Sequence, residues 1–369
     1  MSEDIKLFVS CHKLDTHIPD NALLQPIQVG AALAASRMPN LLHDDEGDSI
    51  SEKNRSYCEL TGQYWAWQNT DADYYGFLHY RRYFNFSKTE YPIHHEPFIF
   101  GDVTFDRNDD ETLQRIDFNE EAMRKVITAH DFIAPEPIEA LEKTTVYEQY
   151  RDSFGHHIED LDTVMDNIRL KYPDIWPSAQ KYLNQTKVYV CNMFVMRREL
   201  FRAYSAFLFD VLSTHEKMRD FSHYSPVARR VSGYLGERIC GMYLTYLYDK
   251  GYDGIDLQRV YFRNTDDGQR PATATGTTGE IETLNFDATV RGPGKIYSAI
   301  HVEHLSDDWQ FRISSTTSDG KQVPAKVVQA ASGPVAVFPI VAQSQTVSVS
   351  AVDADGRTRL NTSLSFLEK

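Results

Sequence analysis

The chain has 369 residues, which suits one domain of about 250 residues and a second of about 100. Hydrophobic residues make up 41% of it and charged residues 25%, as in an ordinary folded protein. Its 38 basic and 53 acidic residues give a formal net charge of −15. Nucleic-acid phosphates and anionic lipids would therefore repel the chain as a whole, so we expect no nucleic-acid partner and only a local basic pocket for any bound phosphate.

The start of the chain and its cysteines favour a cytoplasmic protein. Residues 1–10 contain no cationic stretch followed by a long apolar run, and nowhere do about 18 apolar residues follow one another. We therefore expect neither an export signal nor a membrane span. The cysteines lie far apart without metal-ligand spacing, which predicts free thiols and no disulfides; they are Cys11, Cys58, Cys191 and Cys240.

A short apolar segment opens the chain. Residues 5–10 predict a buried strand, and open α/β sheets bind ligands beyond the carboxyl ends of such strands. His12 and Lys13 follow directly and are therefore candidate ligand-binding residues. Residues 26–35 favour a short helix, and the acidic, glycine-containing stretch 43–48 predicts a loop.

A polar cluster follows that loop. Ser51-Glu52-Lys53-Asn54 leads within a few residues to Glu59 and Trp65. Lys53 could contact a phosphate, and Asn54 or Glu59 a sugar or a base. Core packing is the alternative for Trp65. We interpret the polar cluster as part of a binding site.

A basic motif ends the next strand. Residues 74–78 predict a buried strand that runs into His79-Tyr80-Arg81-Arg82. Arginine offers a fixed fork of donors to phosphate oxygens, and it can neutralise a leaving diphosphate without a metal. The alternative is that these arginines form surface salt bridges. Asp71-Ala72-Asp73 precedes the same strand, at the opposite edge of the sheet, and we interpret it as a turn.

Helices and strands then alternate. Asn119 is a plausible helix N-cap, and residues 131–134 predict a strand. Apolar residues recur at helical spacing over 158–168 and 200–212, and residues 187–196 between them are apolar enough for a buried strand. This alternation predicts an α/β fold with a largely parallel or mixed sheet.

Two more candidates lie in this region. Gly233-Tyr234-Leu235-Gly236-Glu237-Arg238 introduces an apolar helix, and a carboxylate at a loop-to-helix junction could take a proton from a hydroxyl group. Glu237 is therefore a candidate general base. The alternative is that it only interacts with the first helical turn and its dipole. Asn192, in the predicted strand 187–196, is a candidate sugar contact.

Motifs of several other chemistries do not occur in the sequence. It contains no Walker-type phosphate loop, no Gly-x-Gly-x-x-Gly after a strand, no Gly-x-Ser-x-Gly elbow and no His-Glu-x-x-His. We predict no cofactor and no metal-ligating residue, and leave open whether a divalent metal assists.

The character of the chain changes past about residue 275. Serine, threonine, valine and glycine dominate there, and residues 347–352 alternate at period two before a turn-forming stretch. We predict a small β-sandwich, with further strands at 311–315 and 335–341. The predicted organisation is a catalytic domain at 1–270, a linker at 271–279 and a β domain at 280–369.

Several ordered motifs together resemble a bacterial family that is labelled a domain of unknown function, occurs in capsular, exopolysaccharide and O-antigen gene products, and looks like β-galactofuranosyltransferases. The resemblance covers roughly residues 5–262 and leaves out the tail. Its motifs are Val9–Lys13, Ile27–Ala31, Gly47–Asn54, Cys58–Thr61, Tyr64–Trp67, Gly76–Phe84, Cys191–Phe194 and Gly233–Arg238.

The resemblance implies an A-type glycosyltransferase-like fold and a function. The expected reaction moves galactofuranose from its uridine diphosphate donor, with inversion, onto a surface polysaccharide or lipid-linked glycan. The implied catalytic residues are Glu237, His79 and Arg81, and the implied acceptor or sugar contacts are Glu59, Trp65 and Asn192. The implied donor-binding residues are His12, Lys13, Gln28, Gly30, Asp48, Ser51, Glu52, Lys53, Asn54, Tyr80 and Arg82.

One departure from A-type enzymes bears on metal use. Their corresponding strand usually ends in Asp-x-Asp, whose carboxylates hold a divalent ion against the diphosphate, whereas this strand ends in His-Tyr-Arg-Arg. We therefore predict metal-independent transfer.

Two other readings of the chain remain open. The tail could be the working part, as a glycan-binding or assembly module carried by an inactive scaffold. A sugar-nucleotide mutase or epimerase is a third possibility, but its flavin or nicotinamide fingerprint is missing. As a transferase the protein could associate peripherally with membrane-bound polysaccharide assembly enzymes at the inner face of the membrane.

Overall fold

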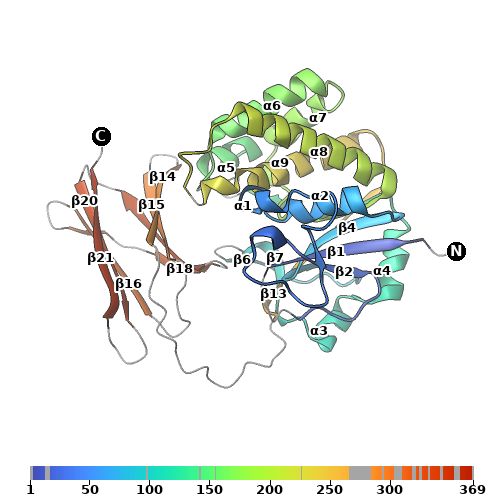
Figure 1. Ribbon diagram of the computed structural model, residues 1–369, viewed down its shortest axis with the longest axis horizontal. Coiled ribbons are helices and arrows are strands. Elements are labelled where there is room, and N and C mark those ends of the chain that lie inside the picture. Colours follow the sequence, from blue (N-terminus) through green and yellow to red (C-terminus); the bar gives the residue numbers. More distant parts are fainter. Residues whose placement is uncertain are drawn as a thin grey trace. The chain divides into compact units, whose positions relative to one another are not determined.

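A computed structural model describes the protein (Figure 1). The described residues are 3–12, 17–96, 99–140, 143–153, 155–225, 227–265, 284–292, 295–302, 310–317, 321–323, 326–330, 333–340, 344–352 and 358–367. The chain divides into two compact units. The first comprises Met1–Gln149, His157–Phe221 and Arg229–Arg270, and the second comprises Tyr150–His156, Ser222–Ala228 and Pro271–Lys369.

The first unit contains a mixed sheet in which 11 strands are described. Four neighbouring strands, in the order β3-β2-β1-β4, run parallel. They are β1 Ile5–Cys11, β2 Leu24–Gln28, β3 Leu42–His43 and β4 Tyr74–His79. On the other side of β4, β11 Phe194–Arg197 pairs antiparallel with both β4 and β8 Phe132–Pro135. Beyond β8, the strand β12 Gly254–Leu257 pairs parallel with it.

A second limb of the sheet leaves from the end of β4. There the chain turns back into β5 Arg82–Phe84, which pairs antiparallel with β13 Arg259–Asn264. β7 Ile99–Arg107 and β6 Ile93–Glu96 complete this limb. A separate two-stranded sheet joins β9 Ile138–Glu139 to β10 Lys187–Val188.

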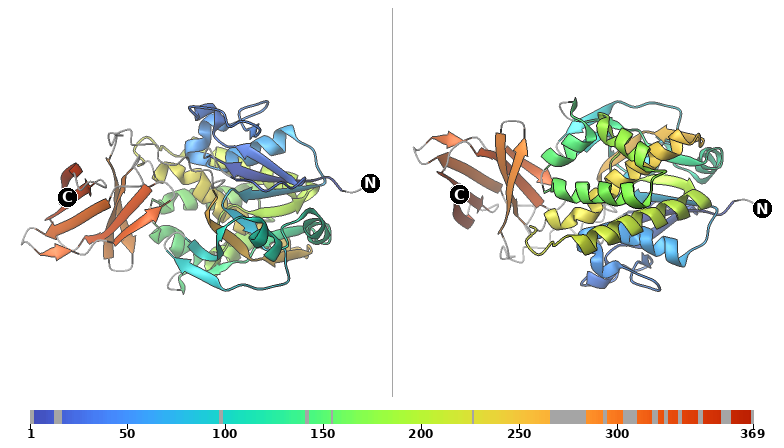
Figure 2. Two further views of the ribbon diagram at one scale, coloured as in Figure 1. Left: turned by 90° about the horizontal axis from the view of Figure 1, so that it is seen from below. Right: turned by 90° about the horizontal axis from the view of Figure 1, so that it is seen from above.

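Both faces of the sheet are buried, because its central strands carry buried side chains at successive positions and these point to opposite faces. In β1, Leu7 and Val9 belong to a core with Met123 and Ile127 of α4. Phe8 points the other way and stacks on Phe77 of β4. Figures 1 and 2 show the long helices α8 and α9 on one side of the sheet and α3 and α4 on the other.

The described helices within residues 1–270 have these bounds. The longer ones are α2 Leu60–Asn69, α6 Ile158–Lys171, α7 Trp176–Asn184, α8 Arg198–Met218 and α9 Val231–Asp249. The shorter ones are α1 Asn54–Tyr57, α3 Asp110–Arg115, α4 Glu120–Ile127 and α5 Val146–Asp152, with 3₁₀ turns η1 Ala31–Leu33, η2 Ser51–Lys53 and η4 Ala228–Arg230. In the described part of the chain, no helix is both long and apolar enough to cross a membrane.

Several local predictions are confirmed. The mixed α/β sheet forms, and the Asn119 side chain caps α4 by accepting from the main-chain N–H of Ala122. All four cysteines are free. Asp71 and Asp73 lie before β4, where they form ion pairs with Arg198.

Two local predictions are wrong. Residues 26–35 form the end of β2 and the turn η1 rather than a helix, because strand pairing with β1 overrides the short helical pattern. Residues 187–196 do not form one strand. They divide between β10 and β11, and Cys191 and Asn192 between them have positive φ, which a continuous strand does not allow.

The second unit contains two antiparallel four-stranded sheets in its described residues. One sheet has the order β14 Leu284–Gly292, β15 Lys295–Val302, β19 Gly333–Ile340 and β18 Lys326–Ala330. The other has the order β17 Gln322–Val323, β16 Gln310–Thr317, β20 Ser344–Val352 and β21 Thr358–Leu367.

The predicted strands in the tail are confirmed, and β20 pairs antiparallel with β21. The turn predicted at 353–356 lies outside the described residues. The β-sandwich and the domain boundaries stay predictions. The predicted linker, 271–279, lies outside the described residues.

Candidate functional site

The carboxyl ends of the parallel strands bring distant polar residues to one edge of the sheet. Ser10 of β1 pairs with His79 of β4, and Cys11 pairs with Gln28 of β2. The exposed His12, just beyond β1, therefore lies beside the end of β4, and the ring centroids of His12 and His79 are 5.8 Å apart. Lys13 lies outside the described residues.

His79-Tyr80-Arg81-Arg82 is a tight hairpin between β4 and β5, in which His79 pairs with Arg82. The hairpin is tied to β1, because the main-chain N–H of Tyr80 donates to Ser10 O at 3.2 Å. Tyr80 is buried and packs its ring against His12 and His79. The motif therefore contains one core residue, Tyr80, and three residues that carry polar groups at the edge.

His79 is uncharged in this setting. Burial is the main cause that holds its pKa well below the usual value of 6.5, and the nearby Arg82, His12 and Arg81 lower it further. The main-chain N–H of Arg81 lies 3.3 Å from Nδ1 of His79. Because Nδ1 accepts this contact, Nε2 carries the proton, so His79 can act as a neutral hydrogen-bond donor.

Two arginines of the hairpin surround one tyrosine. Arg81 Nη1 donates to the hydroxyl of Tyr261 at 3.1 Å, and the guanidinium carbon of Arg82 lies 5.0 Å from the centre of the Tyr261 ring. Within the described residues, no carboxylate lies within ion-pair distance of Arg81. Its charge is therefore available to an anion at this edge.

A buried aspartate orients the second arginine. Asp102, on β7, is 1% exposed and lies 3.6 Å from Arg82 Nε through its Oδ2 atom. Its other oxygen accepts from Arg259 Nε on β13. Asp102, Arg259 and Tyr261 were not predicted as site residues, because nothing in the local sequence links β7 and β13 to the turn after β4.

A second group of polar residues centres on the turn before β11. The main-chain N–H of Cys191 donates to Glu237 Oε1 at 2.9 Å, and Asn192 Nδ2 donates to Glu59 Oε1 at 2.7 Å. Cys191 and Asn192 have φ values of 77° and 46°, in the left-handed region that such side chains rarely adopt. One strained turn thus holds both Glu59 and Glu237.

Glu237 does not occupy a loop-to-helix junction, contrary to the prediction. α9 begins at Val231, so Glu237 lies well inside the helix, beyond the orphan N–H groups of the first turn. The two glycines before it serve close packing. A Cβ on Gly233 would lie 2.9 Å from Cys58 Sγ, and one on Gly236 would lie 2.6 Å from a methyl carbon of Leu60.

Electrostatic interactions link the two groups. Arg230 donates from Nε to Cys58 Sγ at 3.3 Å. Its positive charge contributes to lowering the pKa of both His79 and Glu59. The carboxylate of Glu237 in turn contributes to raising the pKa of Arg82. The basic hairpin and the two carboxyl groups therefore form one cluster, which we call the edge cluster; it comprises His12, Glu59, His79, Arg81, Arg82, Asp102, Cys191, Asn192, Arg230, Glu237, Arg259 and Tyr261.

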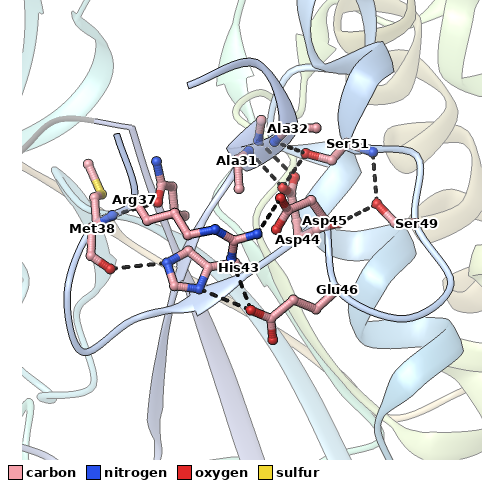
Figure 3. Close-up of polar contacts among 12 residues, drawn as sticks. Ala31, Ala32, Arg37, Met38, His43, Asp44, Asp45, Glu46, Ser49 and Ser51 are labelled. Atoms are coloured by element: carbon pink, nitrogen blue, oxygen red, sulfur yellow. Dashed lines mark hydrogen bonds and ion pairs between the residues drawn. The ribbon is translucent and has the colours of Figure 1, made fainter. Parts of the chain in front are cut away.

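Two of the predicted donor-binding residues, Gly30 and Ser51, contact the buried Asp44, and Figure 3 shows Ser51 and Ala31 beside it. Asp44 is 0% exposed and accepts from the main-chain N–H groups of Gly30 and Ala31 at 2.8 and 2.9 Å. The Ser51 hydroxyl donates to the same carboxylate at 2.5 Å. We call this arrangement the Asp44 knot. It uses the polar groups of Gly30 and Ser51 to join loops of the chain itself.

The other predicted contacts nearby have protein partners. Gln28 donates to Ser36 O and accepts from the main-chain N–H of Met38. Asn54 donates to Cys58 O and to Thr61. The remaining contacts are Lys53 with Glu216, Asp48 with Tyr64 and Asn69, and Trp65 Nε1 with Glu46 O, while Glu52 is exposed. Their roles in substrate binding stay predictions.

In the described parts of the chain, no three His, Cys, Asp or Glu side chains come together as metal ligands would. The predicted metal independence of the reaction stays a prediction.

Residues 6–248 match the protein family described as a domain of unknown function, DUF4422. The chain belongs to this family. Within the edge cluster, His12 to Glu237 fall inside the DUF4422 match, whereas Arg259 and Tyr261 lie beyond it. A search of curated protein sequences gave no match.

The DUF4422 chain is also similar to a solved structure, the bifunctional glycosyltransferase WbbM in its apo form. The sequences are 30% identical, the TM-score is 0.66, and the match covers 71% of this chain. It covers 46% of WbbM, so the chain spans less than half of that protein. A match to the filamin domain of Lin-41, with a TM-score of 0.15, 15% identity and coverage of 20% of this chain and 76% of that one, carries no argument.

Proposed function

We propose that the protein is a glycosyltransferase that uses a nucleoside-diphosphate sugar, with the edge cluster as its active site. The observation that carries the proposal is the pairing of a basic hairpin with two carboxyl groups at the carboxyl edge of an α/β sheet. Arginine guanidinium groups suit a diphosphate, and a carboxylate suits an acceptor hydroxyl. The similarity to WbbM, itself a glycosyltransferase, supports the same reading.

In the proposed reaction an acceptor hydroxyl attacks the anomeric carbon of the donor with inversion. Its oxygen forms the new bond to carbon while Glu237 takes its proton. The bond from carbon to the diphosphate oxygen breaks, and the electron pair leaves with the diphosphate. Arg81, Arg82 and the Nε2–H of His79 would stabilise the charge that develops there, which is the largest contribution such a site makes.

The position of Glu237 supports its role as base. A hydrogen bond from Cys191 fixes one carboxylate oxygen, and Arg238 Nη1 lies 3.4 Å from the other. Arg238 is buried and donates from Nη2 to Gln149 at 2.6 Å, so it is itself held in place. A base held in one orientation reduces the entropy cost of reaching the transition state.

The finer assignments rest on the sequence resemblance. It implies uridine diphosphate galactofuranose as donor, and a cell-surface polysaccharide or lipid-linked glycan as acceptor. The tail would then bind glycan or position the enzyme beside membrane-bound assembly proteins. Full activity on a long native acceptor and an unchanged oligomeric state after truncation near residue 272 would remove this role for the tail.

The decisive experiment incubates the purified protein with a panel of uridine diphosphate sugars, including both ring forms of galactose. Nucleotide release measures turnover, and the shift in thermal unfolding measures binding. We expect release with the furanose form. Release with another sugar instead would keep the transferase and discard galactofuranose, whereas no response to any nucleotide would favour the glycan-binding module on an inactive scaffold.

A metal titration completes the test. We expect turnover to survive a chelator, because the arginines would neutralise the leaving diphosphate. Loss of turnover in chelator that manganese or magnesium restores would show that the transfer needs a metal.

A further inference from the structure

Glu59 and Glu237 are held by successive residues of one turn but in different ways. Glu237 accepts from a main-chain N–H and lies beside the Arg238 guanidinium. Glu59 accepts from the neutral side-chain amide of Asn192, and no Lys, Arg or His of the described residues lies within ion-pair distance of it. Two carboxyl groups in such different settings can take different protonation states and different roles.

The surroundings of Glu59 disfavour its charge. Burial is the main cause that raises its pKa above the usual value of 4.5. The nearby Glu237 raises the pKa of Glu59 further. The hydrogen bond from Asn192 and the charge of Arg230 lower it, but the net shift remains upward.

Four titratable groups face Glu59 from the elements around it. Cys58 precedes it in the chain, and burial raises the pKa of this thiol above 9.0. Tyr204, on α8, interacts electrostatically with Glu59, and burial raises the pKa of this phenol well above 10. Both are therefore uncharged near neutral pH. The charges that face Glu59 are then Glu237 from α9 and Arg230 from η4.

We propose that Glu59 works as an uncharged carboxylic acid that donates a hydrogen bond to the acceptor sugar beside the base Glu237. The inference rests on the proposed function. The proton of Glu59 stays on Glu59 throughout, and only the proton of the acceptor hydroxyl moves, to Glu237. Two ionised carboxylates at this point would repel each other and would leave the sugar without a donor on this side.

The strained turn gives this division of roles a structural basis. Left-handed φ values at two successive non-glycine residues cost free energy, and they persist only where the surrounding packing enforces them. Here the turn aims a main-chain N–H at one carboxyl group and a side-chain amide at the other. Asn192 is 4% exposed, so water does not compete for its contact with Glu59.

Substitutions that mimic the two protonation states test the proposal. Glutamine is an isostere of the uncharged acid and keeps an N–H donor, so E59Q should retain turnover within about threefold of the wild type at pH 7. E59L fills the same space without a donor and should lose about 100-fold. The wild type should lose activity as the pH rises through the pKa of Glu59, and E59Q should lack this alkaline loss. E59Q as inactive as E59L, or an alkaline loss unchanged in E59Q, would overturn the proposal.

Stability against pH provides a readout that does not depend on turnover. A raised pKa in the folded state means that the folded protein binds more protons than the unfolded chain between the two pKa values. Its stability must then fall as pH rises through that window. E59Q should remove this fall, so its unfolding midpoint in urea should rise relative to the wild type from pH 4 to pH 8. A difference that does not change with pH would refute the uncharged Glu59.

The two experiments separate the inference from the proposed function. A wild type that releases nucleotide from no donor would refute the transferase. A pH-independent stability difference would refute the uncharged Glu59 even in an active enzyme.

Discussion

The edge cluster and the Asp44 knot lie at the carboxyl ends of neighbouring parallel strands, yet they use polar residues in opposite ways. In the knot, one buried carboxylate accepts from two main-chain N–H groups and a hydroxyl, all from the loops around it. In the edge cluster, Arg81 contacts a tyrosine hydroxyl and has no carboxylate partner among the described residues. The polar groups of the Asp44 knot are therefore paired within the chain, whereas the edge cluster has a positive charge that can bind an anionic ligand.

The partners of a polar motif indicate whether it belongs to the scaffold or to a ligand site. A buried polar group must find partners, because an unpaired one costs about 1–3 kcal/mol. Where those partners belong to the same loops, as with Gly30 and Ser51, the motif builds the scaffold. Where cations gather beside an uncharged histidine, as at His79 to Arg82, the motif fits an anionic ligand.

The proposed base of the edge cluster, Glu237, can be removed by one isosteric substitution. E237Q removes the proposed base but keeps an oxygen for the Cys191 N–H, so the fold should persist. Turnover should fall by about 10²–10⁴-fold, the usual contribution of a general base, with a change of less than about threefold in donor KM. E199Q, at an exposed glutamate of α8, is the matched control. Nucleotide release within about threefold of the wild type would exclude Glu237 as base.

The second prediction concerns the shape of the cation in the basic hairpin. R82K keeps the charge but loses the planar fork of donors, so kcat/KM for the donor should fall by about 10–100-fold. R202K makes the same change at an exposed arginine that pairs with Asp71 before β4, and it should change kcat/KM by less than about twofold. Equal kinetics for both variants would mean that Arg82 only forms a structural ion pair with Asp102.

The third prediction tests whether the Asp44 knot serves the stability of the fold. D44N places an amide N–H₂ where the Asp44 knot needs an acceptor, so one of its main-chain N–H groups loses its partner. The free energy of unfolding should fall by about 2–3 kcal/mol, while kcat of the folded protein changes by less than about threefold. D45N, whose carboxylate pairs with the half-exposed Arg37, should cost less than about 1 kcal/mol. A fall in kcat without loss of stability would instead place the knot in the active site.

The fold was largely predictable because its signals are local. The spacing of apolar residues indicates α6 and α8, and the Asn119 cap indicates α4. The helix predicted over 26–35 was wrong because pairing of β2 with β1 depends on residues far away in sequence. Strand pairing is a tertiary effect, and a short window of sequence does not contain it.

The site was only partly predictable for the same reason. His79 to Arg82 are adjacent in sequence, so their shared chemistry was visible. Asp102 and Arg259 join them only through the pairing of β5, β13 and β7. The link between Glu59 and Glu237 depends on the left-handed backbone at Cys191 and Asn192. Asparagine favours that conformation less strongly than glycine does, and cysteine does not favour it.

The last prediction concerns Lys53, which belongs either to the scaffold or to the ligand site. Its ammonium donates to Glu216 at 2.8 Å, with both side chains more than a third exposed. Solvent screens such a pair, so K53M should cost less than about 1 kcal/mol of stability. A double-mutant cycle with E216Q in urea would measure the coupling between the two residues.

We expect K53M and E216Q to leave the donor KM unchanged within about twofold. A donor KM raised in K53M but not in E216Q would separate the lysine from its partner, because loss of the ion pair alone would affect both variants alike. Lys53 would then belong to the ligand site, which agrees with the prediction from the sequence that it contacts a phosphate.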